Sequence, residues 1–218
     1  MKVLKFGGTS VGSARRIKEV ANLITGRGTN IIVLSAMSGT TNTLVEIADY
    51  LYKGNTNGAR EIINSLEKRY ATVMEELFAS GEYLAAARER LSEFFHHLRS
   101  FTRDGFTVTE EKEILAQGEL MSTTLMDLYL HEQGFNSVWL PALEFMRTDT
   151  DGEADSDYIA QHLQPMLDSH PDADLFITQG FICRNSKGEI DNLQRGGSDL
   201  TASLIGGALL AEEIEIWT

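Results

Sequence analysis

The sequence predicts an α/β/α sandwich, in which helices cover both faces of a mostly parallel sheet. Two observations lead to this fold class. Short runs of β-branched and aromatic residues alternate along the 218-residue chain with segments of helical periodicity. Residues 30–36 (NIIVLSA) form a nearly unbroken apolar run, which is typical of a strand covered on both faces. Strands separated by helices need crossover connections, and such connections join parallel strands.

The elements follow this alternation in order. Strands are predicted over residues 3–6, 30–36, 137–140, 175–179 and 214–217, and helices over residues 13–24 and 40–52. From residue 57 to 134 the apolar spacing is purely helical. We expect an antiparallel helix pair broken near Gly81, then a third helix over residues 110–133 capped by Gly134. We interpret this block as a helical insertion within one domain that comprises residues 1–218.

The charge and composition of the chain exclude several classes of function. It has 19 Lys and Arg against 32 Asp and Glu, a net charge of −13. Such a balance argues against a nucleic acid or an anionic membrane as the main partner. No apolar run approaches the roughly 20 residues of a membrane helix, and the first residues lack a signal-peptide pattern. The single cysteine, Cys183, excludes an internal disulfide framework and a cysteine-based metal cluster. A cytoplasmic location is therefore expected.

The first candidate site is the segment Lys5-Phe6-Gly7-Gly8, where the first predicted strand ends. Residues 1–53 carry seven basic and three acidic side chains, so cations are concentrated in this part of an acidic protein. Ligands of open parallel sheets bind outside the carboxyl ends of the strands. Two glycines there let backbone N–H groups approach a phosphate, and Lys5 adds a positive charge. The segment is neither a Walker A loop nor GxGxxG, and a tight turn with a solvated lysine fits the spacing equally well.

The second candidate is Arg195-Gly196-Gly197-Ser198-Asp199, which precedes a helical stretch. Ser198 is expected to be the N-cap, with Asp199 in the first turn. A loop followed by a capped helix explains this pattern without a ligand. Alternatively, Gly-Gly before a helix N-terminus forms an anion site, and Arg195 suits a substrate carboxylate. Two Gly-Gly loops with adjacent cations together suggest two anionic ligands held side by side.

Two further segments contain candidate polar groups. Between the second strand and second helix lies Ser35–Asn42, whose hydroxyl groups and Gly39 are expected to cap the helix or to contact a ligand at the same sheet edge. Either Thr40 or Thr41 is able to do both. In the third insertion helix, Glu119 lies beside an apolar stripe and follows Gly118, which costs a helix about 1 kcal/mol relative to alanine. A glycine accepted at that cost suggests close approach of another backbone or a ligand. A solvated glutamate is nevertheless the more common explanation of a lone helix acid.

Other polar features predict structure only. The acidic run over residues 149–157 resembles a calcium loop, but its glycine comes too early and Ala160 occupies the position of the bidentate glutamate. We interpret this run as a solvated loop that caps the next helix. Cys183 is expected to be a packing residue, and no metal ligands are predicted.

Six motifs occur along the chain in a characteristic order: KFGGTSVG from residue 5, VLSAMSGTTN from 33, QGELMS from 117, MRT from 146, ITQGF from 177 and RGGSDLTA from 195. Together they resemble the motifs of the aspartokinases. The resemblance covers essentially the whole chain. It implies an amino-acid kinase fold and transfer of the γ-phosphoryl group of Mg-ATP to the side-chain carboxylate of L-aspartate. The product, 4-phospho-L-aspartate, leads to lysine, threonine and methionine.

The resemblance also implies roles for individual residues. Catalytic roles fall to Lys5, which would stabilise the transferred phosphoryl group, and to Asp199, which would organise the active-site cations. ATP would be contacted by Lys5, Phe6, Gly7, Gly8 and Thr218, and aspartate by Thr41, Glu119, Arg195, Gly196, Gly197 and Ser198. Glu119 would hold the substrate ammonium, and Arg195 would pair with a substrate carboxylate. A homo-oligomer is expected for the full-length protein.

The sequence departs from the aspartokinase pattern at two peripheral positions and stops early. Gln194 replaces a frequent glycine and Leu200 a frequent tyrosine. After Thr218 the family continues with an acidic-Gly segment, a second essential lysine and regulatory ACT domains. The 218-residue chain alone is therefore expected to be inactive or nearly so. Two alternatives stay open: a related kinase with another substrate, and a non-catalytic module that binds aspartate or a nucleotide.

Overall fold

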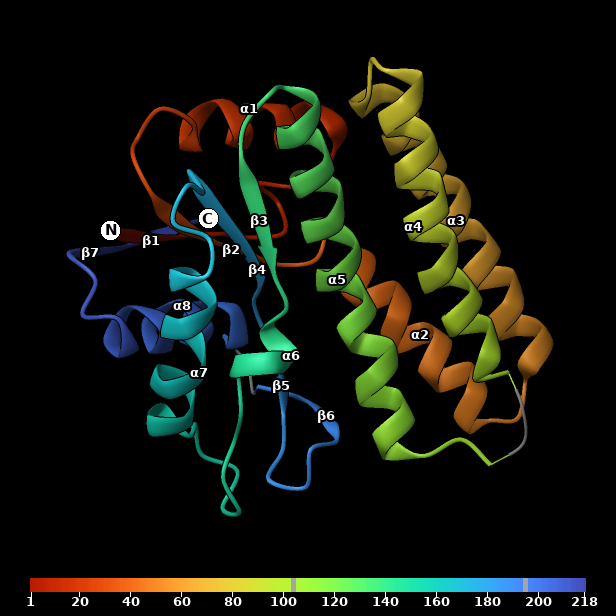
Figure 1. Ribbon diagram of the computed structural model, residues 1–218. Coiled ribbons are helices and arrows are strands. Elements are labelled where there is room, and N and C mark those ends of the chain that lie inside the picture. Colours follow the sequence, from red (N-terminus) through yellow and green to blue (C-terminus); the bar gives the residue numbers. More distant parts are fainter. Residues whose placement is uncertain (103–104, 194–195) are drawn as a thin grey trace.

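The computed structural model describes residues 1–102, 105–193 and 196–218 (Figure 1). Its main sheet has five strands in the order β3-β4-β2-β1-β7. The strands are β1 (Lys2–Phe6), β2 (Asn30–Leu34), β3 (Ser137–Leu140), β4 (Leu175–Gln179) and β7 (Glu213–Trp217). Every pairing between them is parallel. The predicted α/β fold with a parallel sheet is confirmed.

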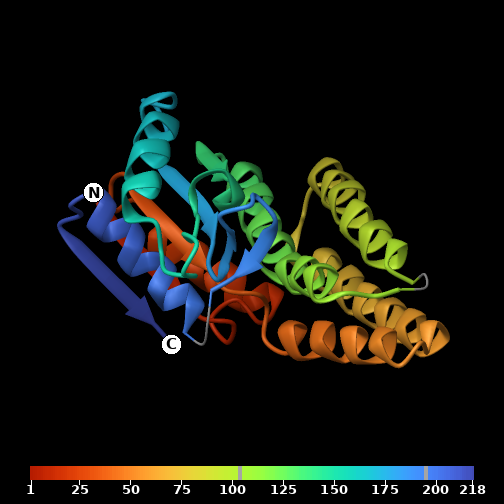
Figure 2. The same cartoon turned by 90° about the horizontal axis from the view of Figure 1, so that it is seen from below.

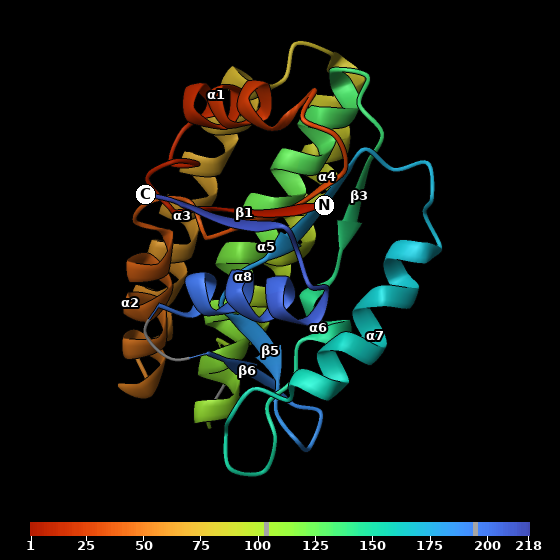
Figure 3. The ribbon, with the colours of Figure 1, turned by 90° about the vertical axis from the view of Figure 1, so that its left-hand side faces the viewer.

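Helices cover both faces of this sheet, as Figure 3 shows with α1 (Ala14–Ile24) on one side and α8 (Gly197–Ala208) on the other. Side chains of a strand alternate between the two faces. Leu4, Ile32 and Ile177 therefore join a core with α1 and the insertion helices. Val3, Ile31 and Phe176 join a second core with α8 and α7 (Ser156–Asp168). At the edge of the sheet β7 lies alongside α8 (Figure 2).

The helical insertion consists of α3 (Thr56–Leu77), α4 (Gly81–Ser100) and α5 (Val108–Glu132), next to α2 (Thr40–Tyr52). These helices stand beside the sheet in Figure 1, and α5 connects the insertion to β3. Gly134 has a φ of +81° and follows the end of α5, as predicted. The predicted break near Gly81 is confirmed, because α3 ends at Leu77 and α4 begins at Gly81. The helix starts there because the hydroxyl of Ser80 accepts the Glu82 N–H.

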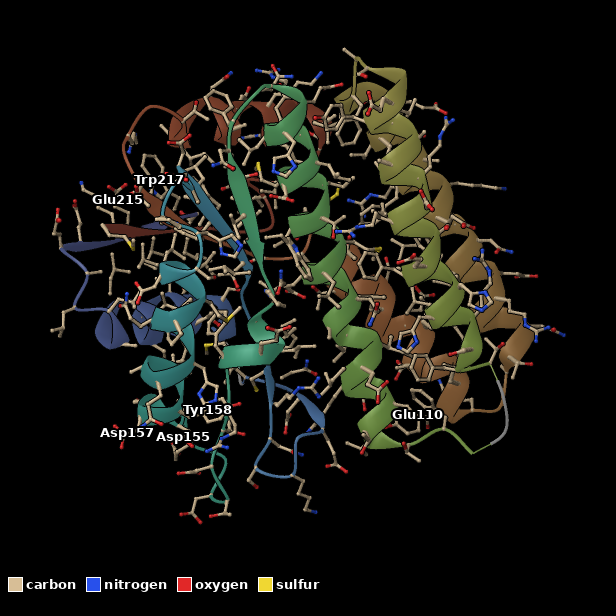
Figure 4. All side chains as sticks on the ribbon, viewed as in Figure 1. Glu110, Asp155, Asp157, Tyr158, Glu215 and Trp217 are labelled. Atoms are coloured by element: carbon tan, nitrogen blue, oxygen red, sulfur yellow. The ribbon has the colours of Figure 1, made fainter. Side chains whose placement is uncertain are left out.

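The remaining elements lie between β3 and α8. They are α6 (Ala142–Phe145), α7 and the antiparallel hairpin β5 (Ile182–Arg184) and β6 (Ile190–Asn192), which the sequence did not predict. Asp155 caps α7 by accepting the Tyr158 N–H, so the acidic run over residues 149–157 caps a helix as predicted (Figure 4). Cys183 is buried, and burial raises the pKa of its thiol to about 12, which fits a packing role.

No helix within the described ranges combines the length and the apolar character that crossing a membrane requires.

Gly118 allows α5 to pack directly on the loop after β2. A Cβ atom at this position would lie 2.8 Å from the Cβ of Ala36. We expect Gly118→Ala to destabilise the fold by about 1–3 kcal/mol, because overpacking outweighs the better helix propensity of alanine. Urea unfolding measures the change. Gly207→Ala in α8 is the control, because a Cβ there meets nothing within 4 Å, and should stabilise the fold by about 0.5–1 kcal/mol. Equal effects of the two substitutions would contradict the packing argument.

Candidate functional site

Two neighbouring cavities lie at the carboxyl ends of β1 and β2. The first has a volume of about 380 Å³ and the second about 250 Å³. Both are lined by Lys5, Ser35 and Thr41. The first is also lined by Gly7, Gly8, Thr9, the segment 36–39, Asn42 and Thr218. The second is also lined by Glu119, Phe181, Gly196, Gly197, Ser198 and Asp199.

Lys5 occupies the wall that the two cavities share. Its side chain is only 9% exposed, and its Nζ lies 2.7 Å from Oδ1 of Asp199 in the first turn of α8. A buried ammonium group requires such a partner, because desolvation without one is costly. The ion pair brings together the two Gly-Gly segments, which are almost 190 residues apart in the chain. The sequence predicted that these two segments would lie side by side. Arg195, predicted beside them, lies outside the described residues.

The first Gly-Gly segment packs closely against the loop that follows β2. A Cβ atom on Gly8 would lie 2.7 Å from the carbonyl oxygen of Ala36, so only glycine fits here. The carbonyl oxygen of Gly8 accepts the Ser38 N–H at 3.0 Å, and the N–H of Gly7 donates to Trp217 at 3.1 Å. Thr218, the next residue, reaches the first cavity.

Phe6 was also predicted to contact a ligand. Its side chain is buried and stacks on Trp217, with ring centroids 5.8 Å apart, and it lines neither cavity. Figure 4 shows Trp217 on β7, at the edge of the sheet. The backbone of Phe6 instead holds the strands together, because its carbonyl oxygen accepts the Ser35 N–H at 3.1 Å.

Two helices direct their N-termini at the cavities. Gly39 caps α2 with a φ of +80°, and Gly196 caps α8 with a φ of +82°; neither cap involves a side-chain hydrogen bond. The predicted capping by Gly39 is therefore confirmed, whereas capping by Ser198, and by Thr40 or Thr41, is wrong. A left-handed glycine makes the turn into each helix, so these hydroxyl groups fall inside the first turn. The positive helix ends are left facing the cavities, where they can attract anions.

The hydroxyl groups at these helix ends have different roles. Thr40 is buried, and its Oγ1 lies 3.2 Å from the hydroxyl oxygen of Tyr70. Thr41 borders both cavities, which leaves its hydroxyl available to a ligand. Ser35 donates from its Oγ to Oγ of Ser198 at 3.0 Å. Ser35 belongs to the predicted candidate segment Ser35–Asn42 and lines both cavities, although the sequence assigned it no role of its own.

Phe181 lines the second cavity but was not among the site residues predicted from the sequence. It has a φ of +69°, which is rare for a bulky residue, and its N–H donates to Oγ1 of Thr201 in α8. A Cβ atom on the preceding Gly180 would lie 2.5 Å from Ser198. This tight packing of the β4 end on α8 fixes the ring of Phe181 at the second cavity.

Glu119 places a buried carboxyl group beside the second cavity. Its side chain comes from α5, and Oε1 accepts the Ala36 N–H at 3.1 Å. Within the described part of the chain, Oε2 is buried and has no hydrogen-bond partner. Burial raises the pKa of this carboxyl group to about 8. The interpretation of Glu119 as a solvated helix acid is therefore wrong, because the contact between Gly118 and Ala36 brings α5 against the site.

Comparison with known proteins decides the family. The profile of the amino acid kinase family matches residues 1–218. This chain belongs to the amino acid kinase family. It is 33% identical to lysine-sensitive aspartokinase 3 of Escherichia coli, over 99% of this chain and 48% of that protein. It is also 33% identical to chloroplastic aspartokinase 1 of Arabidopsis thaliana, over 99% of this chain and 39% of that protein. The chain thus spans half or less of the length of these relatives.

Solved structures agree with this assignment. The crystal structure of E. coli aspartokinase III in complex with aspartate and ADP matches the whole chain, with a TM-score of 0.86 and 30% identity, and the match covers 49% of that protein. The aspartate kinase of Clostridium acetobutylicum gives a TM-score of 0.78 at 20% identity, which supports the fold alone. The fold implied by the six sequence motifs is therefore confirmed.

The chemistry available in this amino acid kinase is electrostatic. The two cavities contain a lysine, two helix N-termini and glycine-flanked backbone N–H groups, and the described residues that line them include no histidine or cysteine. Such groups stabilise the negative charge of a ligand because their positive charges and dipoles are held in place around it. They suit the transfer of a phosphoryl group between two anions better than nucleophilic catalysis by the protein.

Proposed function

We propose that this chain is the catalytic portion of an aspartate kinase. It would transfer the γ-phosphoryl group of ATP to the side-chain carboxylate of L-aspartate, giving 4-phospho-L-aspartate for lysine, threonine and methionine synthesis. The observation that carries the proposal is the Lys5–Asp199 pair at the junction of two anion-binding cavities. The similarity to aspartokinase III crystallised with aspartate and ADP supports the identity of the two ligands.

The two cavities would divide the ligands between them. The first, with Gly7, Gly8 and Thr218, would hold the phosphate chain of ATP. The second would hold aspartate, with Thr41 and the segment Gly196–Ser198 around its carboxylates. Oε2 of Glu119 would accept a hydrogen bond from the substrate ammonium, because this buried oxygen has no donor within the described part of the chain. Arg195 is carried over from the family pattern as a partner of a substrate carboxylate.

The mechanism follows from the charges of the reactants. An aspartate carboxylate is already ionised near neutral pH, so the nucleophile needs no general base. The barrier instead comes from repulsion between this anion and the phosphate chain, so positioning and charge neutralisation supply the catalysis. Lys5 brings its ammonium group to the shared wall, and Asp199 holds it there. Magnesium bound with ATP would supply further neutralisation.

The proposal treats residues 1–218 as one amino-acid kinase domain with the helical insertion over residues 57–134. The homo-oligomer and the cytoplasmic location stay predictions.

Product trapping tests the function directly. The full-length protein is incubated with Mg-ATP and L-aspartate, and hydroxylamine converts the acyl phosphate to a hydroxamate that is measured by absorbance. We expect hydroxamate formation that depends on aspartate and exceeds the rate with L-glutamate or N-acetylglutamate by at least about tenfold. A preference for either other acceptor would favour a related kinase. ADP binding without any turnover would favour a non-catalytic module.

A further inference from the structure

Arg69 of the helical insertion contacts the wall of the first cavity. It lies on α3, and its Nη2 donates to the carbonyl oxygen of Ser38, just before α2. Its Nη1 is so close to Gly39 that a Cβ atom there would lie 3.3 Å away. The next residue of α3, Tyr70, is within hydrogen-bond distance of Thr40. The insertion therefore holds three successive residues at the start of α2.

These contacts continue to the Gly-Gly segment. Ser38 and Gly39 line the first cavity, and the N–H of Ser38 donates to the carbonyl oxygen of Gly8 at 3.0 Å. A short chain of hydrogen bonds thus runs from Arg69 through Ser38 to Gly8. The second cavity contains neither Ser38 nor Gly39 in its lining, so the effect of Arg69 is confined to one side of the site.

The charge of Arg69 also distinguishes it from Lys5. The ammonium group of Lys5 is neutralised by Asp199 at 2.7 Å. Among the residues that the structure describes, no carboxylate lies within ion-pair distance of the Arg69 guanidinium, which is half-buried. In a protein with a net charge of −13, a cation left without a carboxylate next to an anion-binding cavity needs a reason. An anionic ligand in the first cavity supplies one.

We propose that Arg69 is a positioning residue for the phosphate donor. It fixes the Ser38–Gly39 backbone against Gly8 and adds positive potential to the first cavity, where the helix end of α2 also points. The inference rests on the proposed function, because it takes the ligand of that cavity to be the phosphate chain of a nucleotide. The helical insertion then contributes to nucleotide binding, besides supplying Glu119 to the aspartate side.

Nucleotide binding by matched variants tests this role. ADP affinity is measured by calorimetry on the full-length protein, together with the KM values for ATP and aspartate. We expect Arg69→Ala to weaken ADP binding and raise the KM for ATP about tenfold, with the KM for aspartate within twofold of the parent. Lys68→Ala is the control, because it removes the same charge from the adjacent, exposed position of α3. It should change neither KM more than twofold.

Two further measurements separate charge from structure. Arg69→Lys should bind ADP at least threefold more tightly than Arg69→Ala. The loss of ADP affinity in Arg69→Ala should become smaller as the salt concentration is raised, because ions screen the charge of Arg69 in the parent. The inference is overturned if Arg69→Ala binds ADP like the parent, or if both KM values rise equally together with a lower Tm. A parent protein that binds no ADP would count against the proposed function instead.

Discussion

Replacing Lys5 with alanine is expected to lower kcat of the full-length protein about a thousandfold, with a much smaller change in the KM for aspartate. Removing one preorganised group that stabilises transition-state charge costs about 10²- to 10³-fold in other enzymes. Lys5 carries a full charge, is nearly buried, and occupies the wall shared by both cavities. Its loss also leaves Asp199 unpaired beside two anions. Release of ADP in a coupled assay, with each substrate varied in turn, measures both constants.

Lys2→Ala provides the matched control for this experiment. Lys2 lies on the same strand as Lys5 and loses the same charge, but it pairs with Glu213 on β7 and lines neither cavity. We expect its kcat to stay within twofold of the parent value. If Lys5→Ala kept the activity of the parent, Lys5 would not be a catalytic residue. Equal losses in both variants would attribute the effect to net charge and not to position.

Local periodicity was sufficient to predict most of the fold. The helix Thr40–Tyr52 and the strands Ser137–Leu140 and Leu175–Gln179 have the predicted bounds, because apolar spacing and turn residues agree there. The helix starts were less predictable. Ser198 is a good N-cap by residue type, yet Gly196 takes that position, and at α2 the predicted alternative Gly39 is the cap and not Thr40 or Thr41. Both glycines have a left-handed backbone, with φ of +80° and +82°, which a serine or threonine rarely adopts.

The same distinction applies to the site. Lys5 and Asp199 could be brought together from the sequence, because the carboxyl ends of parallel strands meet at one edge. Arg69 and Phe181 could not, because their roles depend on how α3 packs on α2 and how β4 packs on α8. Glu119 is an intermediate case. The residues alone favoured a solvated acid, and only the resemblance to aspartokinases assigned it to the substrate.

Glu119→Gln is expected to weaken aspartate binding strongly while stabilising the fold at high pH. The buried carboxyl group of Glu119 has a pKa of about 8, against 4.5 for a free glutamate. Between these values the folded state keeps a proton that the unfolded state has lost. The parent therefore loses stability as pH rises from about 4.5 to 8, by up to about 1.4 kcal/mol per pH unit. Glutamine cannot titrate, so the advantage of the variant should grow over this range and level off above pH 8, as urea unfolding at several pH values would measure.

Aspartate binding should favour the ionised form of Glu119, whereas folding favours its protonated form. An ammonium group beside Oε2 favours the ionised carboxyl group and lowers its pKa, so aspartate binding should release a proton below about pH 8. The affinity of the parent should then rise with pH up to that value. Glu119→Gln should bind aspartate at least about tenfold more weakly near pH 8, because a neutral amide replaces a charged hydrogen-bond acceptor, and its affinity should not vary over the same range. Calorimetry in buffers of different ionisation enthalpy measures both the affinity and the proton released.

Glu111→Gln is the control for both measurements. Glu111 lies on the same helix but lines neither cavity. It accepts a hydrogen bond from the hydroxyl of Tyr52, and a glutamine oxygen can accept the same bond. Its free energy of unfolding and its aspartate affinity should depend on pH in the same way as those of the parent. Aspartate binding by Glu119→Gln that matches the parent in strength and proton release would mean that the substrate ammonium lies elsewhere. The second cavity would then have to hold aspartate in another orientation, with Glu119 serving only to anchor α5 to Ala36.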